Sequence, residues 1–370
     1  MVLKFKFPDA WSCECGREHE IPLRWILIEE RCLFKLPEIA NELGMGKRCL
    51  IVEDSTTRRI AGERVREALE GAHYSVSEAI IERADIENAR RVGEGLQGCD
   101  FSVAVGGGAP IDVAKITAYE NNLPFISVPT ALSHDGIASP IASIIQNRRK
   151  TSLLANPPVA VVADLEILLN APDRMISAGY GDVVAKVTSL KDWELGRDEK
   201  REYYCERAAS LAFQAVTELI QQPKMTSRKE ALKSLVEALL NSGASMIVAG
   251  SSRPASGAEH LFSHFIDLSV DKAAMHGEQC GLGAILFAKY HEKHNPNWWK
   301  QTEFQWQNIK RMLKDWGTDP SLGRLGISRD LASRALVEGA GIRPERYTIV
   351  HKRPLTLAEA TRLLEETGVT

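Results

Sequence analysis

The sequence lacks any long apolar run. No segment approaches the roughly 20 consecutive apolar residues that a membrane-spanning helix needs. The chain start from Lys4 to Asp9 is polar where a secretion signal has an apolar core. These absences argue against membrane insertion and predict a cytoplasmic protein.

The sequence also lacks a large excess of charge of either sign. The sequence has 46 Lys and Arg against 49 Asp and Glu, which leaves a net charge of -3. Proteins that bind nucleic acid usually present a basic face, so no nucleic-acid partner is expected. The 370 residues, 44% of them hydrophobic, are enough for two domains that each bury a core.

Cysteine is scarce, and its number is odd. Five of the seven cysteines are isolated by long gaps, which is typical of a reducing compartment and not of a disulfide framework. The exception is Cys13-Glu14-Cys15 with His19 close behind, which matches half of a zinc knuckle. A closed zinc site needs four ligands, and no second pair with matching spacing follows. We therefore interpret residues 1–25 as a reduced and loosely ordered N-terminal arm in preference to a metal site.

The first half of the sequence alternates short β-branched runs with amphipathic stretches. Strands are predicted at 48–52, 75–81, 101–105, 124–129 and 159–163, and helices at 59–70, 86–96 and 110–119. Strand, helix and strand at this spacing predict right-handed crossovers and a parallel sheet with both faces covered.

The second half has almost no β-branched runs. Helical spacing dominates instead, for example at 231–240, 280–291 and 355–366. The sequence thus predicts an α/β domain over residues 1–171 and an all-helical domain over residues 172–370.

A glycine turn, Gly106-Gly107-Gly108, joins the third predicted strand to a helix that begins near Pro110. Glycines let the main chain approach an anion, and the N–H groups at the start of the helix stabilise its charge. The usual dinucleotide fingerprint is absent because Ile111 stands where a third glycine should be, and no Walker A loop follows. A tight turn without any ligand is the alternative.

Two polar segments support a dinucleotide site. The loop from Thr130 to Gly136 follows the fourth strand directly, so it should face the same edge of the sheet as the glycines. Asp54 ends the first strand, where a carboxylate can bind the adenosine ribose. That position favours NAD over NADP, although the neighbouring Ser55, Thr56 and Thr57 weaken the preference.

Ligand-type residues recur in the helical half, at Asp182, His260, His264 and His276. Two imidazoles and a carboxylate form the three-ligand set of a catalytic zinc with one open position. His260 and His264 share a helix face if this segment is helical. A single helical histidine is usually structural, so both interpretations stay open at this point.

Several motifs together resemble one family. They are V-G-G-G-A-P-I-D-V-A-K at 105–115, S-H-D-G-x-A-S-P at 133–140, G-Y-G-D at 179–182, G-x-E-H-L-F-S-H at 257–264, H-G-E-Q at 276–279 and R-P-E-R-Y-T-I at 343–349. Over most of residues 45–350 the chain is similar to the sn-glycerol-1-phosphate dehydrogenases. That family belongs to the superfamily of iron-dependent alcohol dehydrogenases, glycerol dehydrogenase and dehydroquinate synthase.

The resemblance implies a Rossmann-like parallel sheet followed by a helical domain, and a site that draws on both. It implies dinucleotide contacts from Gly108, Ala109, Pro110, Ile111, Asp112, Thr130, Ala131, Leu132, Ser133 and Ser139. We add to these Asp54 and the other two glycines of the turn, Gly106 and Gly107. It implies Asp182, His260 and His276 as metal ligands, and Asp135 and His264 as the residues that contact substrate.

The implied reaction is reversible reduction of dihydroxyacetone phosphate with NAD or NADP and one divalent metal. Zinc is expected, with nickel or iron as alternatives. The partners implied are a phosphorylated small molecule and further copies of this chain, in a dimer or larger assembly. Ala109 stands where archaeal members commonly have lysine. The Cys13/Cys15 arm and the tail beyond about residue 350 also depart from the archaeal pattern and point to a bacterial-type member.

Three alternatives remain. A polyol dehydrogenase of the same superfamily would use unphosphorylated glycerol. A dehydroquinate-synthase-like cyclase would use a glutamate as carboxylate ligand and more basic residues around the metal, whereas this chain offers Asp182. A nucleotide sensor without activity would not need the glycine turn together with three ligand-type residues.

Overall fold

The computed structural model describes residues 2–3, 10–147, 149–221, 227–270 and 273–370. The chain start from Lys4 to Asp9 lies outside the described residues. Two compact units make up the chain: Met1–Pro172 with Pro223–Ile247, and Asp173–Gln222 with Val248–Thr370. The chain therefore returns to the first unit after its first passage through the second, whereas the sequence predicts a single boundary between residues 171 and 172.

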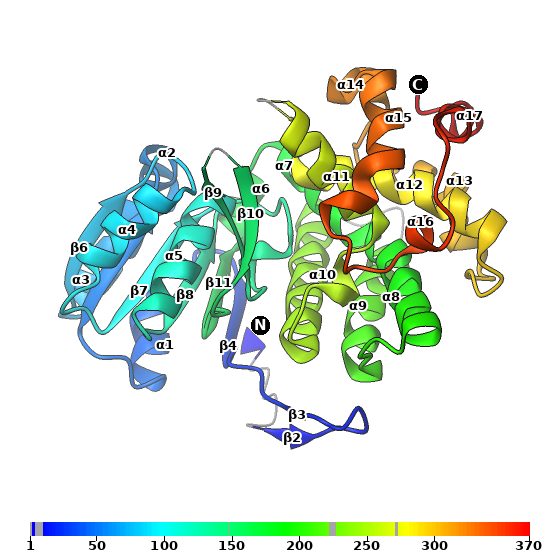
Figure 1. Cartoon of the computed structure of the whole chain (residues 1–370). Helices are drawn as coiled ribbons and strands as arrows, with labels where there is room; N and C mark the ends of the chain where they lie inside the picture. The colour runs from blue at the N-terminus through cyan, green and yellow to red at the C-terminus, as the bar shows by residue number, and fades with distance from the viewer. Residues whose placement is uncertain (1, 4–9, 148, 222–226, 271–272) are drawn as a thin grey trace. The chain divides into compact units, whose positions relative to one another are not determined.

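A seven-stranded sheet forms the first unit within the described residues, in the order β1-β4-β11-β8-β7-β5-β6 (Figure 1). Its strands are β1 (Val2–Leu3), β4 (Trp25–Glu29), β5 (Arg48–Glu53), β6 (Ser75–Ile80), β7 (Phe101–Gly106), β8 (Phe125–Pro129) and β11 (Ala160–Asp164). All neighbouring strands from β4 to β6 in this order pair in parallel. The edge strand β1 pairs antiparallel with β4. The predicted parallel sheet is confirmed, with β4 as a strand that the sequence pattern did not reveal.

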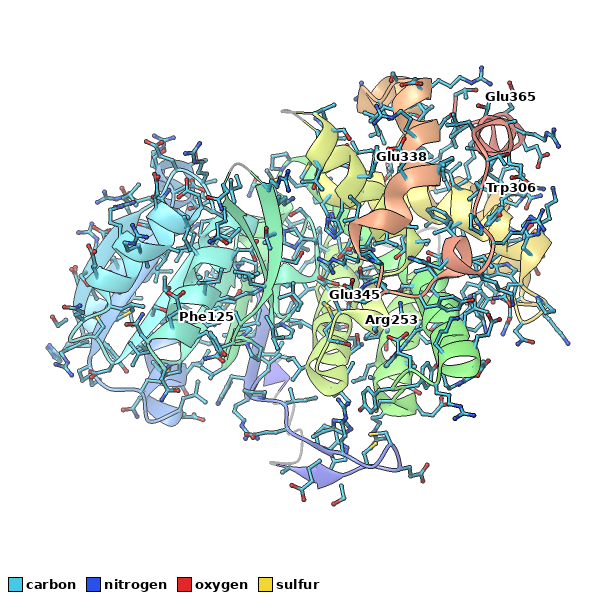
Figure 2. All side chains as sticks on the ribbon, viewed as in Figure 1. Phe125, Arg253, Trp306, Glu338, Glu345 and Glu365 are labelled. Atoms are coloured by element: carbon cyan, nitrogen blue, oxygen red, sulfur yellow. The ribbon has the colours of Figure 1, made fainter. Side chains whose placement is uncertain are left out.

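Alternate side chains of the sheet face two helical layers. Cys49 and Ile51 of β5 share a core with α1 (Leu36–Glu42) and α3 (Glu63–Gly71). Leu50 faces the other layer, because a Cβ at Gly95 in α4 (Ile86–Gly95) would lie 3.6 Å from its side chain. α5 (Gly108–Glu120) packs beside α4 and against β7. Phe125 of β8 is fully buried (Figure 2). A sheet covered on both faces explains the continuous apolar strands in the sequence.

Local details of the first unit differ from the sequence pattern. The segment expected to be one helix from 59 to 70 is divided between a π-helical turn, η2 (Arg58–Gly62), and α3, and the short helix α2 (Ser55–Thr57) precedes it. An antiparallel hairpin of β9 (Ile141–Gln146) and β10 (Arg149–Leu154) stands apart from the main sheet. Its side chains are largely exposed in β10, so it lacks the apolar signal of the buried strands. The short helix α6 (Leu165–Leu169) follows β11.

The second unit is helical throughout its described residues, as predicted. Its helices of one turn or more are α7 (Asp173–Val184), α8 (Lys186–Lys200), α9 (Glu206–Ile220), α11 (Ala258–Ser269), α12 (His276–His294), α13 (Trp306–Asp315), α14 (Leu322–Leu325), α15 (Arg329–Glu338), α16 (Ile349–Lys352) and α17 (Leu357–Thr367). α12 packs against α7, α11, α13 and α17, which makes it the central helix of the unit.

Helix α10 (Arg228–Ala249) contributes most of its length to the first unit. By length and a mean hydropathy of 1.2 it could cross a membrane, but 72% of the tested window is buried inside the protein. That degree of burial is typical of a core helix.

Candidate functional site

The glycine turn ends β7 and begins α5. Gly107 is the N-cap residue of this 13-residue helix and offers no side chain, so the first N–H groups are not capped by it. A Cβ at Gly108 would lie 2.7 Å from Nε2 of His134, whose Nδ1 accepts a hydrogen bond from the Gly136 N–H. The Thr130 N–H donates to the Gly106 carbonyl at 3.0 Å. The loop from 130 to 136 therefore lies directly against the turn, and the first turn of α5 has the geometry of an anion site.

Most of the other predicted dinucleotide residues have buried side chains. This group comprises Pro110, Ile111, Asp112, Thr130, Ala131, Leu132 and Ser139, whereas Ala109 and Ser133 are partly exposed. Ile111 and Leu132 are core residues at 1% and 0% exposure. A bound cofactor would meet their main chain.

Lys115 is a fully buried cation behind the turn, and the sequence analysis missed it. Its ammonium donates to the Ile141 carbonyl at 2.7 Å and to the Ser139 hydroxyl at 3.3 Å, and lies 3.5 Å from the Asp112 carboxylate. Burial lowers the pKa of Lys115. The lysine ties the predicted dinucleotide residue Ser139 to α5. Its spacing of three residues from Asp112 in the same helix was the signal available in the sequence.

Asp54 caps the helical turn that follows β5. Its Oδ1 accepts hydrogen bonds from the Thr56 and Thr57 N–H groups at 2.8 Å, and the Asp54 N–H donates to the Thr57 hydroxyl. Both of these main-chain hydrogen bonds are accepted by Oδ1 of Asp54. The carboxylate therefore already caps the helix, and a ribose contact would be a second role for the same side chain.

Glycines bring the helices of the predicted metal set together. A Cβ at Gly181 in α7 would lie 2.2 Å from the Gly277 carbonyl in α12, so these two main chains touch. A Cβ at Gly283 in α12 would lie 2.9 Å from the side chain of Glu259 in α11. Only residues without a side chain allow α7 and α11 to approach α12 this closely.

The predicted metal ligands Asp182 and His276 both lie near the third, His260, in the second unit. Oδ1 of Asp182 lies 3.8 Å from Nε2 of His260, and the centroids of the His260 and His276 rings lie 5.0 Å apart. Two ligands bound at about 2.1 Å to one tetrahedral ion lie about 3.4 Å apart, so the first of these distances suits a shared cation. Asp182 and His260 are 1% and 7% exposed.

Glu259 orients the His260 ring. Its carboxylate lies 2.8 Å from His260 Nδ1, and it accepts hydrogen bonds from the Gly257 N–H and the Thr188 hydroxyl. Burial alone would raise the pKa of Glu259, but these hydrogen bonds, with that to His260 the strongest, hold it below its ordinary value. A carboxylate on Nδ1 leaves Nε2 with its lone pair directed at a cation, the arrangement found behind most metal-bound histidines.

Two further side chains adjoin the ligand set. The Lys186 ammonium bonds Oδ1 of Asp182 at 2.8 Å, and neither side chain is more than 1% exposed. The ligand atoms of Cys280, His260 and His276 lie within 4.8 Å of one another. Burial raises the pKa of the Cys280 thiol well above its ordinary value, so Asp182 is the better source of negative charge. Lys186 follows Asp182 by four residues, and Cys280 follows His276 by four. Because residues at this spacing share a helix face, the sequence carried a signal for both.

The two predicted substrate residues belong to different units. His264 lies on α11 with its ring centroid 6.0 Å from that of His276. Asp135 begins the short helix η3 (Asp135–Ile137), and its Oδ2 accepts a hydrogen bond from Ser242 of α10 at 2.7 Å. The structure thus groups His264 with the metal set and Asp135 with the loop beside the glycine turn.

Comparison with known proteins agrees with this architecture. A family model described as iron-containing alcohol dehydrogenase matches residues 27–172. The chain is 39% identical to a glycerol-1-phosphate dehydrogenase [NAD(P)+] of Thermococcus kodakarensis, over 94% of this chain and 97% of that protein. It is 40% identical to the protein of the same name from Pyrococcus abyssi, over 90% and 95% of the two chains.

Solved structures of similar fold are more distant in sequence. A probable glycerol dehydrogenase from Sinorhizobium meliloti has a TM-score of 0.72 at 20% identity, covering 92% of this chain and 95% of that chain. An iron-containing alcohol dehydrogenase has a TM-score of 0.73 at 18% identity, covering 95% and 99%. At this level of identity the likeness establishes the fold alone.

Proposed function

The chain belongs to the glycerol-1-phosphate dehydrogenase family, and we propose that it transfers hydride reversibly between NAD(P)H and dihydroxyacetone phosphate to form sn-glycerol 1-phosphate. One observation carries the proposal: Asp182 and His276 both lie beside His260, whose ring is held by Glu259. Two imidazoles and one carboxylate, with Asp182 and His260 buried and His276 partly exposed, have the donor chemistry of a divalent metal site.

We infer that a divalent cation, with zinc first and nickel or iron as alternatives, binds through Asp182, His260 and His276. When bound, it supplies Lewis acidity toward the substrate carbonyl. The chain's own part is to hold the ligand atoms in place. Glu259 and Ser263, which lie 2.8 Å from His260 and 3.2 Å from His276, keep the two rings from turning.

We propose that the phosphates of the dinucleotide bind at the first turn of α5. Gly107 and Gly108 present main-chain N–H groups without side-chain obstruction, and the helix dipole favours the phosphate charge. Thr130 and Ser133 line the loop that packs against the turn. The nicotinamide must lie on one face of the substrate carbonyl so that hydride reaches a single side of carbon 2.

The substrate oxygen takes up a proton as hydride reaches carbon 2. We assign His264 to this proton and Asp135 to the neighbouring hydroxyl. Ser242 holds the Asp135 carboxylate at 2.7 Å, which fixes the direction in which the other oxygen can accept a hydrogen bond.

The test is steady-state NADH oxidation with a panel of ketones. Dihydroxyacetone phosphate should be reduced at least tenfold more efficiently than dihydroxyacetone, and the product should be oxidised again as sn-glycerol 1-phosphate and not as the 3-phosphate. Preference for the unphosphorylated ketone would favour a polyol dehydrogenase. Chelation should abolish the reaction and metal addition restore it, and activity unaffected by chelation would rule out the metal's role.

Assembly and location are part of the same proposal. We place the enzyme in the cytoplasm, where its seven cysteines, all reduced in the structure, are stable as thiols. We also expect a dimer or larger homo-oligomer, which light scattering at several protein concentrations would test.

A further inference from the structure

The N-terminal arm forms a hairpin with a defined turn, contrary to the loose order that its composition suggested. β2 (Trp11–Ser12) and β3 (Glu18–His19) pair antiparallel, with Trp11 opposite His19. Between them the Cys13 N–H donates to the Arg17 carbonyl at 3.0 Å, and the Gly16 N–H donates to the Cys13 carbonyl at 2.9 Å. Gly16 has a φ of +82°, which glycine adopts without strain.

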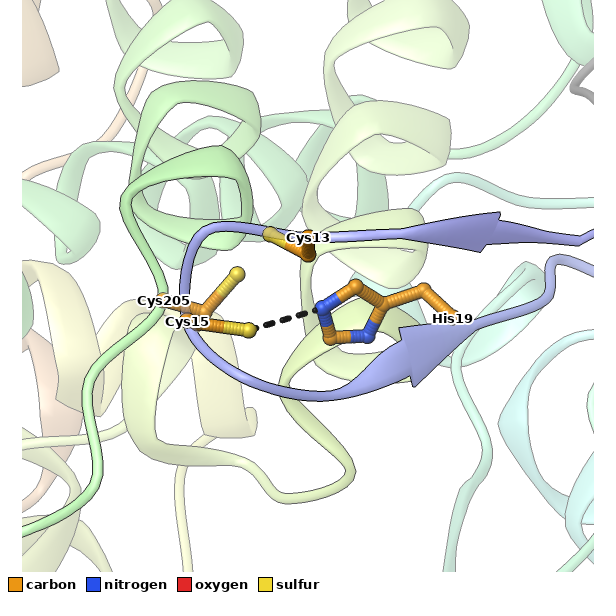
Figure 3. Close-up of side chains that lie close together, drawn as sticks. All are labelled: Cys13, Cys15, His19 and Cys205. Atoms are coloured by element: carbon orange, nitrogen blue, oxygen red, sulfur yellow. Dashed lines mark hydrogen bonds between the residues drawn. The ribbon is translucent and has the colours of Figure 1, made fainter.

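This turn places three potential metal ligands on one side of the hairpin. The ligand atoms of Cys13, Cys15 and His19 lie within 4.8 Å of one another, and Cys15 Sγ is 3.1 Å from His19 Nε2 (Figure 3). Trp11 packs its ring against the His19 ring with centroids 5.4 Å apart, and His19 is only 6% exposed. The imidazole is therefore buried on one side and directed at the two thiols on the other.

Two residue pairs of β-ladder are too few to stabilise a hairpin in water. Trp11 is the only large apolar side chain among residues 11–19 of the hairpin, and its ring packs against His19. Small elements of this kind are commonly held by a metal, whose binding free energy becomes folding free energy. The ligand set of thiolates and an imidazole matches structural zinc.

We propose that the arm binds one zinc ion through the thiolates of Cys13 and Cys15 and the imidazole of His19. Tetrahedral zinc with three protein ligands keeps its fourth position for a water molecule. Cys32 and Cys49 lie in the core of the sheet, and Cys280 belongs to the other ligand set. The site shares no residue with the proposed catalytic set.

Metal content measured by mass spectrometry tests the proposal on the full chain. The wild-type protein, purified with zinc, should hold two metal ions, His276→Ala one, Cys13→Ser one, and the double variant none. If His276→Ala keeps both ions while Cys13→Ser loses one, the catalytic assignment fails and the arm site stands. If Cys13→Ser loses none, the arm site is overturned.

Two matched cysteine variants define the ligand set. Cys99→Ser removes a partly exposed thiol whose Sγ donates to the Gly95 carbonyl, and it should leave the metal content unchanged. Cys15→Ser should lose the arm zinc as Cys13→Ser does. Full retention of zinc by Cys15→Ser would overturn the proposed ligand set.

Cobalt substitution tests thiolate ligation in a protein whose cysteines are unchanged, so its result does not depend on whether a cysteine variant folds. The His276→Ala protein loaded with Co²⁺ should show thiolate-to-cobalt charge-transfer bands and the strong d–d bands of a tetrahedral site. Weak d–d bands without charge transfer would overturn thiolate ligation in a chain whose cysteines are all intact. Cys13→Ser should also keep NADH oxidation within about threefold of wild type, because the arm lies outside the proposed catalytic set.

Discussion

The two units present their candidate ligand groups in different ways. The first relies on main chain: glycines at the end of β7 and uncapped N–H groups at the start of α5. The second relies on side chains that are buried and held by others, as His260 is held by Glu259. A main-chain site tolerates changes of side chain that keep its geometry, whereas a side-chain site is lost with any one ligand. The difference predicts a graded response to substitution.

The largest effect is expected from His276→Ala. Removal of one of three ligands should release the metal, and loss of Lewis acidity worth several kcal/mol should lower kcat by about a thousandfold or more. Metal content and NADH oxidation measure the two consequences, while NADH binding followed by fluorescence should persist. His294→Ala, at the far end of the same helix, is the control. Equal loss of NADH binding would show that His276 is structural and would remove the contrast between the units.

Glu259→Gln should weaken metal binding without destroying the ligand set. The amide cannot hold the His260 ring as the carboxylate does, and such changes behind a metal ligand lower affinity by about 10–100-fold. Activity should return at high metal concentration, as a titration of activity against free metal would reveal. The exposed Glu338→Gln should leave that titration unchanged. An unaltered metal affinity in Glu259→Gln would mean that the ring is held by packing alone.

Gly108→Ala should raise the KM for NADH by about tenfold, with a smaller change in kcat. The new Cβ would lie 2.7 Å from His134 Nε2 and must displace a ring that the Gly136 N–H holds. A misplaced turn loses phosphate contacts worth about 1.4 kcal/mol for each factor of ten. Gly71→Ala, where a Cβ meets nothing within 4 Å, is the matched control. A KM equal to that of the control would place the phosphates elsewhere.

The smallest effect on activity is expected at a buried carboxylate of the first unit, Glu53, whose substitution changes stability instead. Both oxygens of Glu53 are buried without a hydrogen-bond partner among the described residues, whereas Glu259 has three. Burial, aided by the charge of Glu78, raises the pKa of Glu53 to about 7. In the unfolded chain the pKa is about 4.3. Between pH of about 4.3 and about 7, Glu53 is therefore protonated in the folded chain but ionised in the unfolded chain. The free energy of unfolding falls as the pH rises through this window.

Glu53→Gln should remove this dependence. Denaturant unfolding from pH 5 to 7.5 should show the wild-type free energy of unfolding falling relative to the variant by about 2 kcal/mol. The exposed Glu87→Gln should follow the wild-type curve. Parallel curves for Glu53→Gln and wild type would mean that Glu53 is ionised in the folded protein.

The sequence predicted the parts that rest on local patterns. Continuous apolar runs such as 101–105 located buried strands, and the switch to helical spacing after residue 170 located the helical unit. β4 was missed, although it pairs with β11 and stands second in the sheet order, because its neighbours along the chain carry no clear turn or helix signal. The return of α10 to the first unit depends on packing between distant segments, which no local pattern reports.

The candidate ligands were visible as residue types, but the groups behind them were not. Asp182, His260 and His276 stood out in glycine-flanked motifs, whereas Lys115 and Lys186 looked like ordinary helical lysines. Their burial follows from helix packing, as does the contact of Gly181 with Gly277. The arm illustrates the opposite error, because Cys13, Cys15 and His19 were set aside for want of further ligands, whereas the hairpin turn brings their ligand atoms together.

Lys186 has a consequence for how the protein matures. Its ammonium neutralises Asp182 inside the second unit, so the carboxylate does not depend on an ion from solution for its charge balance. A nascent chain can thus complete the helical unit during synthesis and acquire its catalytic cation afterwards. The supply of metal in the cell would then govern how much of the folded enzyme is active and leave the amount that folds unchanged.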